Sequence, residues 1–314
     1  MNTVFQIVLL IIGFIMLIKG ADIFVDGSVS IATRLKIPKI IIGLTIVSMG
    51  TGTPEVVIGI IASAGGSSDL AVGNIIGSNI FNLLFIVGLC AMIRPIAAEF
   101  KDIAKDYWVS VAGATALLIF MLLFGDFIPR YIGMVFVFAF VIYMAFLVRQ
   151  AMNRSKKEPE LEETKPKTSP VKNIFLVILG LVLIIIGAHF AVSSAESLAL
   201  TLGLSERVIG ITIIAVGTSL PELAIFLISG KKGENDIAIS VIIGSNIFNI
   251  LFVLGISGIV MPLAIDSSMK IDLVVLIVGK LLFMLFSITG KKITRLEGLV
   301  FSLIYIVYIA FIVL

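Results

Sequence analysis

The stretch IIGLTIVSMGTGTPEVVIGII, residues 41–61, occurs a second time in the chain as VIGITIIAVGTSLPELAIFLI, residues 208–228. Each copy carries a glutamate, Glu55 in the first and Glu222 in the second, inside an apolar run that is long enough to cross a membrane. A charged side chain in hydrocarbon is costly, and it marks a functional site by default. The two glutamates therefore guide both the prediction of the fold and the search for a function.

A second motif repeats in the same register. The stretch IIGSNIFNLLF at 75–85 returns as IIGSNIFNILF at 242–252, so both motifs are shifted along the chain by the same offset. Aligned without a gap, residues 42–88 and 209–255 are identical at 24 of 47 positions. The chain therefore contains an internal duplication.

The composition indicates a membrane protein. Hydrophobic residues make up 59% of the 314 residues, charged residues make up 14%, and the mean hydropathy is +1.20. A soluble domain carries about 25% charged residues. Ten apolar segments are long enough to cross ~30 Å of hydrocarbon as helices. They cover residues 4–33, 39–63, 69–94, 108–125, 129–149, 173–203, 207–229, 236–262, 271–289 and 296–313. We expect an all-α polytopic protein of the cell or inner membrane, with the lipid bilayer as its surroundings.

The sequence also excludes several classes. Residues 1–18 carry no positive n-region and no small-x-small cleavage site follows, so we expect a span there and not a cleaved signal peptide. Cys90 is the only cysteine, which excludes an intramolecular disulfide and a thiolate metal cluster. The basic residues lie at loop ends, so the net charge of +3 reflects membrane topology and does not indicate nucleic-acid binding.

One polar stretch divides the chain. The sequence NRSKKEPELEETKPKTSPVK, from Asn153 to Lys172, is rich in Glu, Lys and Pro and lacks an apolar stripe, which is typical of a flexible linker. We therefore expect a first five-helix repeat at 1–150, a linker at 151–172 and a second five-helix repeat at 173–314. Because five is an odd number, the second repeat must enter the membrane from the opposite side.

The distribution of Lys and Arg supports this inversion. With the linker in the cytoplasm, 18 basic residues lie in inner loops and three, Arg130, Arg207 and Lys270, lie in outer loops. Cytoplasmic loops carry such an excess. We therefore expect two inverted repeats, with both termini outside. Inverted repeats are typical of transporters that bind substrate near the midplane, where the repeats meet.

The first motif predicts a broken helix beside each glutamate. It reads GTGTPE at 50–55 and GTSLPE at 217–222. Proline has no N–H and clashes with the carbonyl four residues back, so it frees carbonyl oxygens close to the carboxylate. Hard cations prefer such oxygen ligands. A divalent cation between Glu55 and Glu222 would neutralise both charges at once.

The second motif adds polar side chains on one helix face. The serine and the last asparagine of each copy are four residues apart. These residues are Ser78 and Asn82 in the first copy and Ser245 and Asn249 in the second. An alternative interpretation is hydrogen bonding between helices, with glycines that allow close packing. It applies most to Asn79 and Asn246, which point elsewhere.

Three charges late in the first span are weaker candidates. Lys19, Asp22 and Asp26 lie at helical spacing. Their counterparts in the second repeat do not keep the charge; they are Ile186, His189 and Ser193. We interpret these charges as local ion pairing or as anchors at the membrane interface.

With these motifs the chain resembles the cation/Ca2+ exchanger superfamily, and within it the prokaryotic Na+/Ca2+ exchangers. The resemblance covers all ten predicted spans and rests on the pairs G-T-x-x-P-E and G-S-N-I-F-N, one pair in each half. It implies a core of four spans that are broken into short helices. The long first span of each half would slide across this core.

The resemblance also implies the ligands of the ions. Ca2+ would bind to Glu55, Glu222 and the backbone carbonyls of Thr51 and Thr218. One flanking Na+ site would use Thr51, Ser78 and the Ser48 carbonyl. The other would use Thr218, Ser245 and the Ala215 carbonyl. Asn82 and Asn249 would complete the centre between them. Because both ions would share the glutamates, their binding would be mutually exclusive, and this competition would couple their transport. The transported ions are the only ligands implied, without a cofactor or an obligate protein partner.

The chain departs from the family pattern at a few positions. Gly52 replaces a hydroxyl residue that Ser219 keeps, and Ser48 stands where the second repeat has Ala215. Asn249 occupies a position that is often acidic in K+-dependent exchangers, which argues against K+ co-transport. The first motif has G-T where the H+/Ca2+ branch has G-N, which argues against that branch. These departures affect the predicted ion preference more than the predicted fold.

We expect a secondary antiporter that moves Ca2+ outward on the inward Na+ gradient. Acidic pH should inhibit it, because protons compete with Ca2+ for the carboxylates. The nearest alternative is an H+-coupled or other-cation exchanger on the same fold, and a passive channel is a weaker one. An intramembrane enzyme could use the two glutamates as acid and base. The sequence offers no metal-binding His pair and no second catalytic group, so we do not expect an enzyme.

Overall fold

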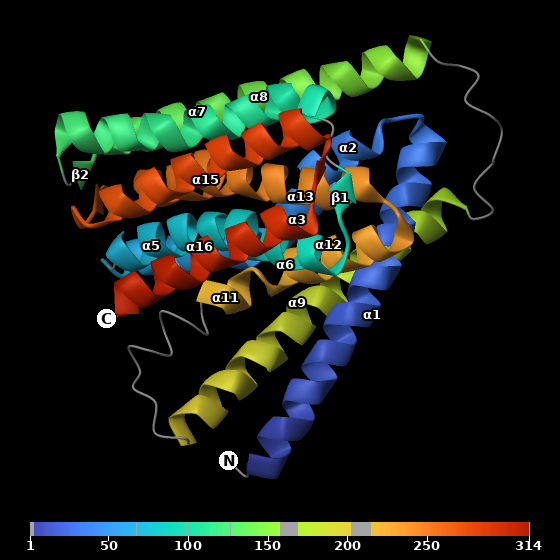
Figure 1. The fold of residues 1–314 in the computed structure, drawn as a ribbon, viewed down its shortest axis with the longest axis horizontal. Coiled ribbons are helices and arrows are strands. Elements are labelled where there is room, and N and C mark those ends of the chain that lie inside the picture. Colours follow the sequence, from blue (N-terminus) through green and yellow to red (C-terminus); the bar gives the residue numbers. More distant parts are fainter. Residues whose placement is uncertain are drawn as a thin grey trace.

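The computed structural model describes residues 3–66, 68–97, 100–125, 127–157, 169–201 and 215–313, and these residues are almost entirely helical (Figure 1). The first half contains α1 (Thr3–Leu35), α2 (Lys39–Ile42), the π-helical turn η1 (Gly43–Val47), α3 (Ser48–Thr51), α4 (Thr53–Ala64), α5 (Ser68–Ile80), the π-helical turn η2 (Phe81–Ile86), α6 (Val87–Ile93), α7 (Phe100–Phe124) and α8 (Arg130–Lys157). The second half contains α9 (Pro170–Thr201), α11 (Ala215–Thr218), α12 (Leu220–Lys232), α13 (Asn235–Ile247), the π-helical turn η4 (Phe248–Val253), α14 (Leu254–Val260), α15 (Met269–Gly290) and α16 (Arg295–Val313). The predicted all-α architecture is confirmed.

Eight described helices are long and apolar enough to cross a membrane. They are Thr3–Leu35, Ser68–Ile93, Ile103–Phe124, Arg130–Asn153, Pro170–Ala195, Asn235–Val260, Met269–Gly290 and Arg295–Ile312. A ninth candidate is the pair Lys39–Thr51 and Thr53–Ala64, which bends by 46° at a break. The predicted span at 207–229 begins outside the described residues, so the total of ten stays a prediction.

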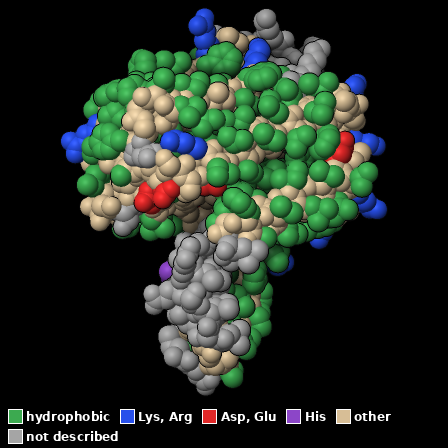
Figure 2. Space-filling view, turned by 60° about the vertical axis from the view of Figure 1, so that its left-hand side comes forward, with side chains coloured by type: hydrophobic (Ala, Val, Ile, Leu, Met, Phe, Trp, Pro, Cys, Tyr) green, Lys and Arg blue, Asp and Glu red, His purple; other side chains and the backbone are tan. Residues whose placement is uncertain are grey.

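The core lies around two central helical rods. One rod is α5, η2 and α6, and the other is α13, η4 and α14. In the most apolar stretch of the second rod 94% of the residues are buried, against 17% in α16 at the periphery. Large apolar side chains are exposed instead on α1, α8, α9, α15 and α16. Figure 2 shows such a surface, on which hydrophobic side chains cover most of the face. Helices with exposed apolar faces are suited to contact with lipid.

The helices α1 and α9 form a long antiparallel pair that leans away from the other helices (Figure 1). A Cβ atom on Gly13 would lie 2.8 Å from the carbonyl oxygen of Gly187, and one on Gly20 would lie 2.9 Å from that of Gly180. Small residues let helix backbones approach closely within a membrane. Gly13 and Gly180 occupy equivalent positions in the two repeats, as do Gly20 and Gly187. Each glycine therefore packs against the counterpart of the other one.

Short strands hold the loops together in pairs. The strand β1 (Ile96–Ala97) pairs with β4 (Lys292–Ile293), and β2 (Phe127–Ile128) pairs with β3 (Leu263–Ala264), both antiparallel. Because paired strands are neighbours, the loop after α6 and the loop before α16 lie at one end of the molecule. The loop before α8 meets the loop after α14 in the same way.

Candidate functional site

Each predicted glutamate stands at the start of a helix that follows a break. Glu55 is the third residue of α4, which is separated from α3 by Gly52 alone. Glu222 is the third residue of α12, which is separated from α11 by Ser219 alone. The preceding proline in each motif cannot donate a backbone hydrogen bond, so it ends the earlier helix and begins the next. The predicted helix breaks are confirmed.

The two carboxylates lie together inside the protein. Both Glu55 and Glu222 have an exposed fraction of 0%. They come from different halves of the chain, and they are close enough for their negative charges to repel each other. The helix starts on which they stand are favourable places for negative charge, but this effect is small beside the cost of burying two like charges. The pair therefore needs positive charge beside it, supplied either by protons or by a bound cation.

A serine hydroxyl contacts Glu222 directly, and a buried threonine lies at the end of a helix that packs against α12. The Ser245 hydroxyl on α13 donates a hydrogen bond to Oε1 of Glu222 over 3.2 Å. The Thr51 hydroxyl, at the end of α3, donates to the backbone carbonyls of Val47 over 3.2 Å and Ser48 over 3.4 Å. Thr51 is itself fully buried. Because α3 contacts α12, Thr51 and Glu222 are brought to the same region from different repeats of the sequence.

A second group of hydroxyls lies across the interface between the halves. The Ser78 Oγ on α5 is 3.3 Å from the Thr218 Oγ1 on α11. Thr218 Oγ1 also donates to Oδ1 of Asn74 over 3.4 Å. The motifs predicted Ser78 and Thr218 as neighbours of the glutamates. They did not predict Asn74, whose counterpart is Val241 and which therefore breaks the repeat.

Several buried polar atoms at this place have no hydrogen-bond partner within the described protein. They are both carboxylate oxygens of Glu55, Oε2 of Glu222, Oδ1 and Nδ2 of Asn82, and Oδ1 of Asn249. A buried polar atom without a partner costs about 1–3 kcal/mol, and more when it is charged. Five of these six atoms are oxygens. Oxygen ligands from carboxylates, amides and hydroxyls are those that hard cations prefer, so this set fits Ca2+ and Na+.

Ser48 and Ala215 are the two predicted site residues that remain. Ser48 is fully buried, and its hydroxyl donates to the carbonyl of Gly43 over 2.6 Å. The Ser48 carbonyl accepts the N–H of Gly52 over 3.0 Å, so this oxygen takes part in helix bonding. Ala215 begins α11, and its side chain lies outside the described residues.

The other two asparagines of the second motif join the halves. Asn79 Nδ2 donates to the Asn246 carbonyl, and Asn246 Nδ2 donates to the Asn79 carbonyl, each over 3.4 Å. This reciprocal pair bears out the alternative interpretation of hydrogen bonding between helices. Asn249 Nδ2 also donates to Oδ1 of Asn79 over 3.4 Å, which fixes the orientation of one predicted site residue.

Sequence reasoning did not predict a role for Lys280. This lysine lies within α15 and is 1% exposed. Its ammonium donates to the carbonyl of Ser110 over 2.8 Å and to the Ser110 hydroxyl. It lines a small cavity together with Asn246, Tyr107 and several apolar side chains. A lone lysine inside an apolar segment was the only signal in the sequence that could have pointed to this cluster.

Comparison with known proteins places the chain among transporters. A family model described as sodium/calcium exchanger protein matches residues 5–149 and 172–314. The putative antiporter CaxA of Alkalimonas amylolytica is 38% identical over 309 residues, which cover 96% of each chain. The sodium/calcium exchanger MaX1 of Methanosarcina acetivorans is 31% identical and again covers 96% of each chain. The inner membrane protein YrbG of Escherichia coli is 36% identical, covering 82% of this chain and 81% of its own.

Solved structures agree with these relatives. The sodium-calcium exchanger NCX_Mj, soaked with 2.5 mM Na+ and 10 mM Sr2+, superposes with a TM-score of 0.85 and 32% sequence identity. The superposition covers 98% of this chain and 99% of that one. This likeness extends over the whole helical membrane fold.

Proposed function

The chain belongs to the sodium/calcium exchanger protein family, and from this premise we propose that it exchanges Na+ for Ca2+ across the inner membrane by alternating access. Family membership makes it a multi-pass membrane protein for cation/Ca2+ antiport, not an enzyme. The Na+ coupling and the ion ligands are our proposal. The observation that carries them is the pair of fully buried glutamates, whose carboxylate oxygens Glu55 Oε1 and Oε2 and Glu222 Oε2 have no partner in the described protein.

In this proposal one Ca2+ lies between Glu55 and Glu222. The backbone carbonyls of Thr51 and Thr218 add neutral oxygens, as the helix breaks beside them allow. Asn82 and Asn249, which bring unpartnered buried oxygens, complete the centre. A doubly charged ion offsets both carboxylates, which a single proton or a single Na+ does not. The divalent cation is therefore the best electrostatic match to this pair.

Na+ would bind in the same place through more oxygens of lower charge. On one side these come from Thr51, Ser78 and the Ser48 carbonyl. On the other side they come from Thr218, Ser245 and the Ala215 carbonyl. The bond of Ser245 to Glu222 keeps one hydroxyl beside a carboxylate, and the Ser78 and Thr218 hydroxyls lie beside each other. Because Na+ and Ca2+ would need the same glutamates, each ion would displace the other, and the displacement would couple their transport.

We further propose ten spans arranged as two inverted five-helix repeats. The antiparallel pairing of α1 with α9 supports this, because these helices are equivalent in the two repeats and Gly13 and Gly20 each pack against the counterpart of the other. The π-helical turns η2 and η4 also fall at equivalent positions, Phe81–Ile86 and Phe248–Val253. Two copies with opposite orientation around one site are the arrangement that alternating access needs.

The pairing of the strands supports the proposed orientation in the membrane. The strands β1 and β4 bring together two loops that carry several basic residues, among them Arg94, Lys291 and Lys292. The strands β2 and β3 bring together loops whose basic residues are Arg130 and Lys270. The basic end would be cytoplasmic. Both termini would then lie outside and the linker inside.

Reconstituted vesicles test this function. Purified protein in liposomes should accumulate Ca2+ when an outward Na+ gradient is imposed without an H+ gradient. The variant E55Q should not do so, whereas E297Q, the same change at a glutamate that bonds to Thr294 at the start of α16, should behave as the wild type. Ca2+ accumulation on an H+ gradient alone would replace the proposal by H+ coupling. Wild-type uptake by E55Q would show that the ligands are elsewhere.

A further inference from the structure

The last residue of α12 reaches across to α1. The ammonium of Lys232 lies 2.8 Å from Oδ1 of Asp22 and 2.5 Å from Oδ1 of Asp26. It also donates to the backbone carbonyl of Asp22 over 2.9 Å. The ammonium of Lys232 therefore has three oxygen atoms of α1 within hydrogen-bond distance. Asp22 and Asp26, two of the three charges that we interpreted from the sequence as local ion pairs or interface anchors, are thus paired with a lysine from the other half of the chain.

This cluster exists in only one of the two repeats. In the second repeat, the positions equivalent to Asp22 and Asp26 are occupied by His189 and Ser193. In the first repeat, the position equivalent to Lys232 is occupied by Gly65, which ends α4. These equivalent positions therefore provide neither the carboxylates nor the ammonium of the cluster. A contact between α9 and α4 that is equivalent to the one between α1 and α12 would therefore lack this ion pair.

The packing of α1 on α12 also differs from the packing of α9 on α4. On α12, the side chains of Leu220, Ala224 and Ile228 pack into the apolar cluster that contains α1. Their counterparts on α4 are Thr53, Val57 and Ile61, and all three are exposed, Val57 by 49% and Ile61 by 66%. In the described part of the chain, α9 makes no packing contact with α4 that is comparable to the contact of α1 with α12. The structure therefore has one end covered by α1 and the equivalent surface at the other end uncovered.

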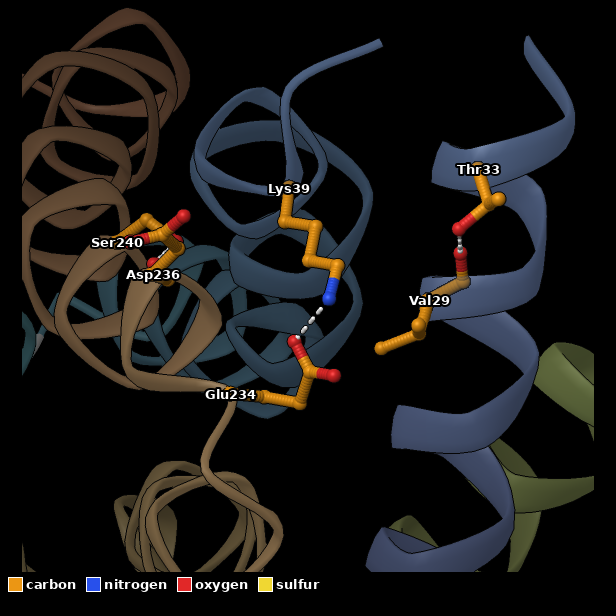
Figure 3. A network of polar contacts seen from close by, with 6 residues as sticks. All are labelled: Val29, Thr33, Lys39, Glu234, Asp236 and Ser240. Carbon is orange, nitrogen blue, oxygen red and sulfur yellow. Dashed lines mark hydrogen bonds and ion pairs between the residues drawn. The ribbon is translucent and has the colours of Figure 1, made fainter. Parts of the chain in front are cut away.

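A second ion pair lies at the covered end. Lys39 at the start of α2 donates to Glu234, just before α13, over 2.6 Å. Figure 3 shows this pair beside the last turns of α1, which carry Val29 and Thr33. It joins two parts of the core to each other and does not involve a side chain of α1. The contact of Lys232 with Asp22 and Asp26, by contrast, joins the core to charged side chains of α1 itself.

We propose that Asp22, Asp26 and Lys232 form an ion-pair latch that holds α1 against the core at the cytoplasmic end and so sets the side to which the ion site opens at rest. This inference rests on the alternating access proposed above. If the repeats exchange their contacts between the two access states, the latch stabilises only the state in which α1 covers α12. A contact present in one of two states shifts their ratio by its own free energy. The resting protein would then favour the state whose site is open to the outside.

How far the latch shifts the ratio of the two access states depends on how exposed its three side chains are. The side chains are 25% exposed for Lys232, 46% for Asp22 and 62% for Asp26. Ion pairs with this exposure are weak, and two of them together correspond to about a two- to tenfold change in an equilibrium ratio. This is enough to choose a resting state without preventing transport, as a latch in a working cycle requires.

Cysteine labelling of α4 measures the ratio of the two states directly. A cysteine at Ile61, in a background where the buried Cys90 is replaced by alanine, would be exposed in the present state and covered by α9 in the other. Its labelling by a membrane-impermeant maleimide, in liposomes without Na+ or Ca2+, should be slower in K232Q and in D22N/D26N. The ratio of exposed to covered protein should fall about two- to tenfold. The matched control is K231Q, which removes a neighbouring charge that forms no ion pair within the described residues.

A charge exchange separates the latch from a general effect on folding. The double variant D26K/K232D restores one pair with reversed charges and should label faster than K232D alone. Equal labelling of K232Q and the wild type would overturn the proposal, as would equal slowing by K231Q and K232Q. Labelling does not depend on transport, so the latch can fail while Na+-driven Ca2+ uptake persists. Conversely, a change in labelling without any uptake in the wild type would contradict the proposed function and not the latch.

Discussion

Replacing Glu55 by glutamine should weaken the binding of Ca2+ about 100-fold while leaving the protein folded. Both oxygens of Glu55 are buried and have no partner in the described protein, so no other group there compensates for this charge. Glutamine has nearly the same shape, and without ions it removes the repulsion between Glu55 and Glu222. We therefore expect E55Q without ions to be at least as stable to heat as the wild type.

The magnitude follows from the loss of one partner of a buried charge pair. Such a loss costs about 3 kcal/mol or more, which weakens binding about 100-fold. At a Ca2+ concentration of about 100 times the wild-type Kd, Ca2+ should stabilise the wild type by about 2.7 kcal/mol. Under the same conditions a 100-fold weaker site gives only about 0.4 kcal/mol. A thermal unfolding scan in detergent, with and without Ca2+, measures this difference.

The comparison with E297Q makes the assay specific. Glu297 bonds to Thr294 at the start of α16, away from the paired glutamates, so E297Q should keep the full stabilisation by Ca2+. If E55Q kept it too, Glu55 would not be a ligand. If E55Q were markedly less stable without ions, the carboxylate would have a structural partner, which would contradict the reasoning from its unpartnered oxygens.

Three further predictions concern the surroundings of the site. S245A removes the hydroxyl that donates to Glu222 and should weaken ion binding by about 1.5–3 kcal/mol, measured by isothermal titration of Ca2+ and of Na+; an unchanged affinity for both ions would contradict it. Ca2+ uptake into vesicles should fall as the pH is lowered, because the carboxylates bind Ca2+ only when deprotonated, and higher Ca2+ should restore it; inhibition that Ca2+ does not relieve would argue against competition at the glutamates. S110A removes a partner of the buried Lys280 and should lower the free energy of unfolding by about 1–3 kcal/mol. K280M removes the charge itself and should lower the free energy of unfolding by less. The opposite order in thermal unfolding would refute this account of the cluster.

The repeated motifs made the centre of the molecule predictable. Pro54 and Pro221 cannot continue a helix, so the breaks before Glu55 and Glu222 follow from covalent chemistry alone. The apolar length of the segments around them predicted the membrane-spanning helices in the same direct way. These features depend on residues that are close together in the chain, where local rules apply.

The remaining contacts join residues that are far apart in the chain, and sequence patterns within one segment do not predict them. Thr218 donates a hydrogen bond to Asn74 in the other half of the chain, and Lys280 donates one to Ser110 on another helix. The partner of Asp22 was not predictable either, because Lys232 lies in the other half of the chain. Asn74, Asp22 and Lys232 each have a counterpart in the other repeat that cannot make the same contact. Departures from the repeat are thus the signal by which such contacts could be sought.

Equilibrium binding of radiolabelled Ca2+ to the purified protein, at a series of Na+ concentrations, tests most directly whether one pair of glutamates holds both ions. The account predicts that Na+ displaces Ca2+ completely, that saturating Ca2+ overcomes this displacement, and that E55Q and E222Q each bind Ca2+ about 100-fold more weakly than the wild type. Binding of Ca2+ that does not change with Na+, or that keeps the wild-type affinity in both variants, would contradict it.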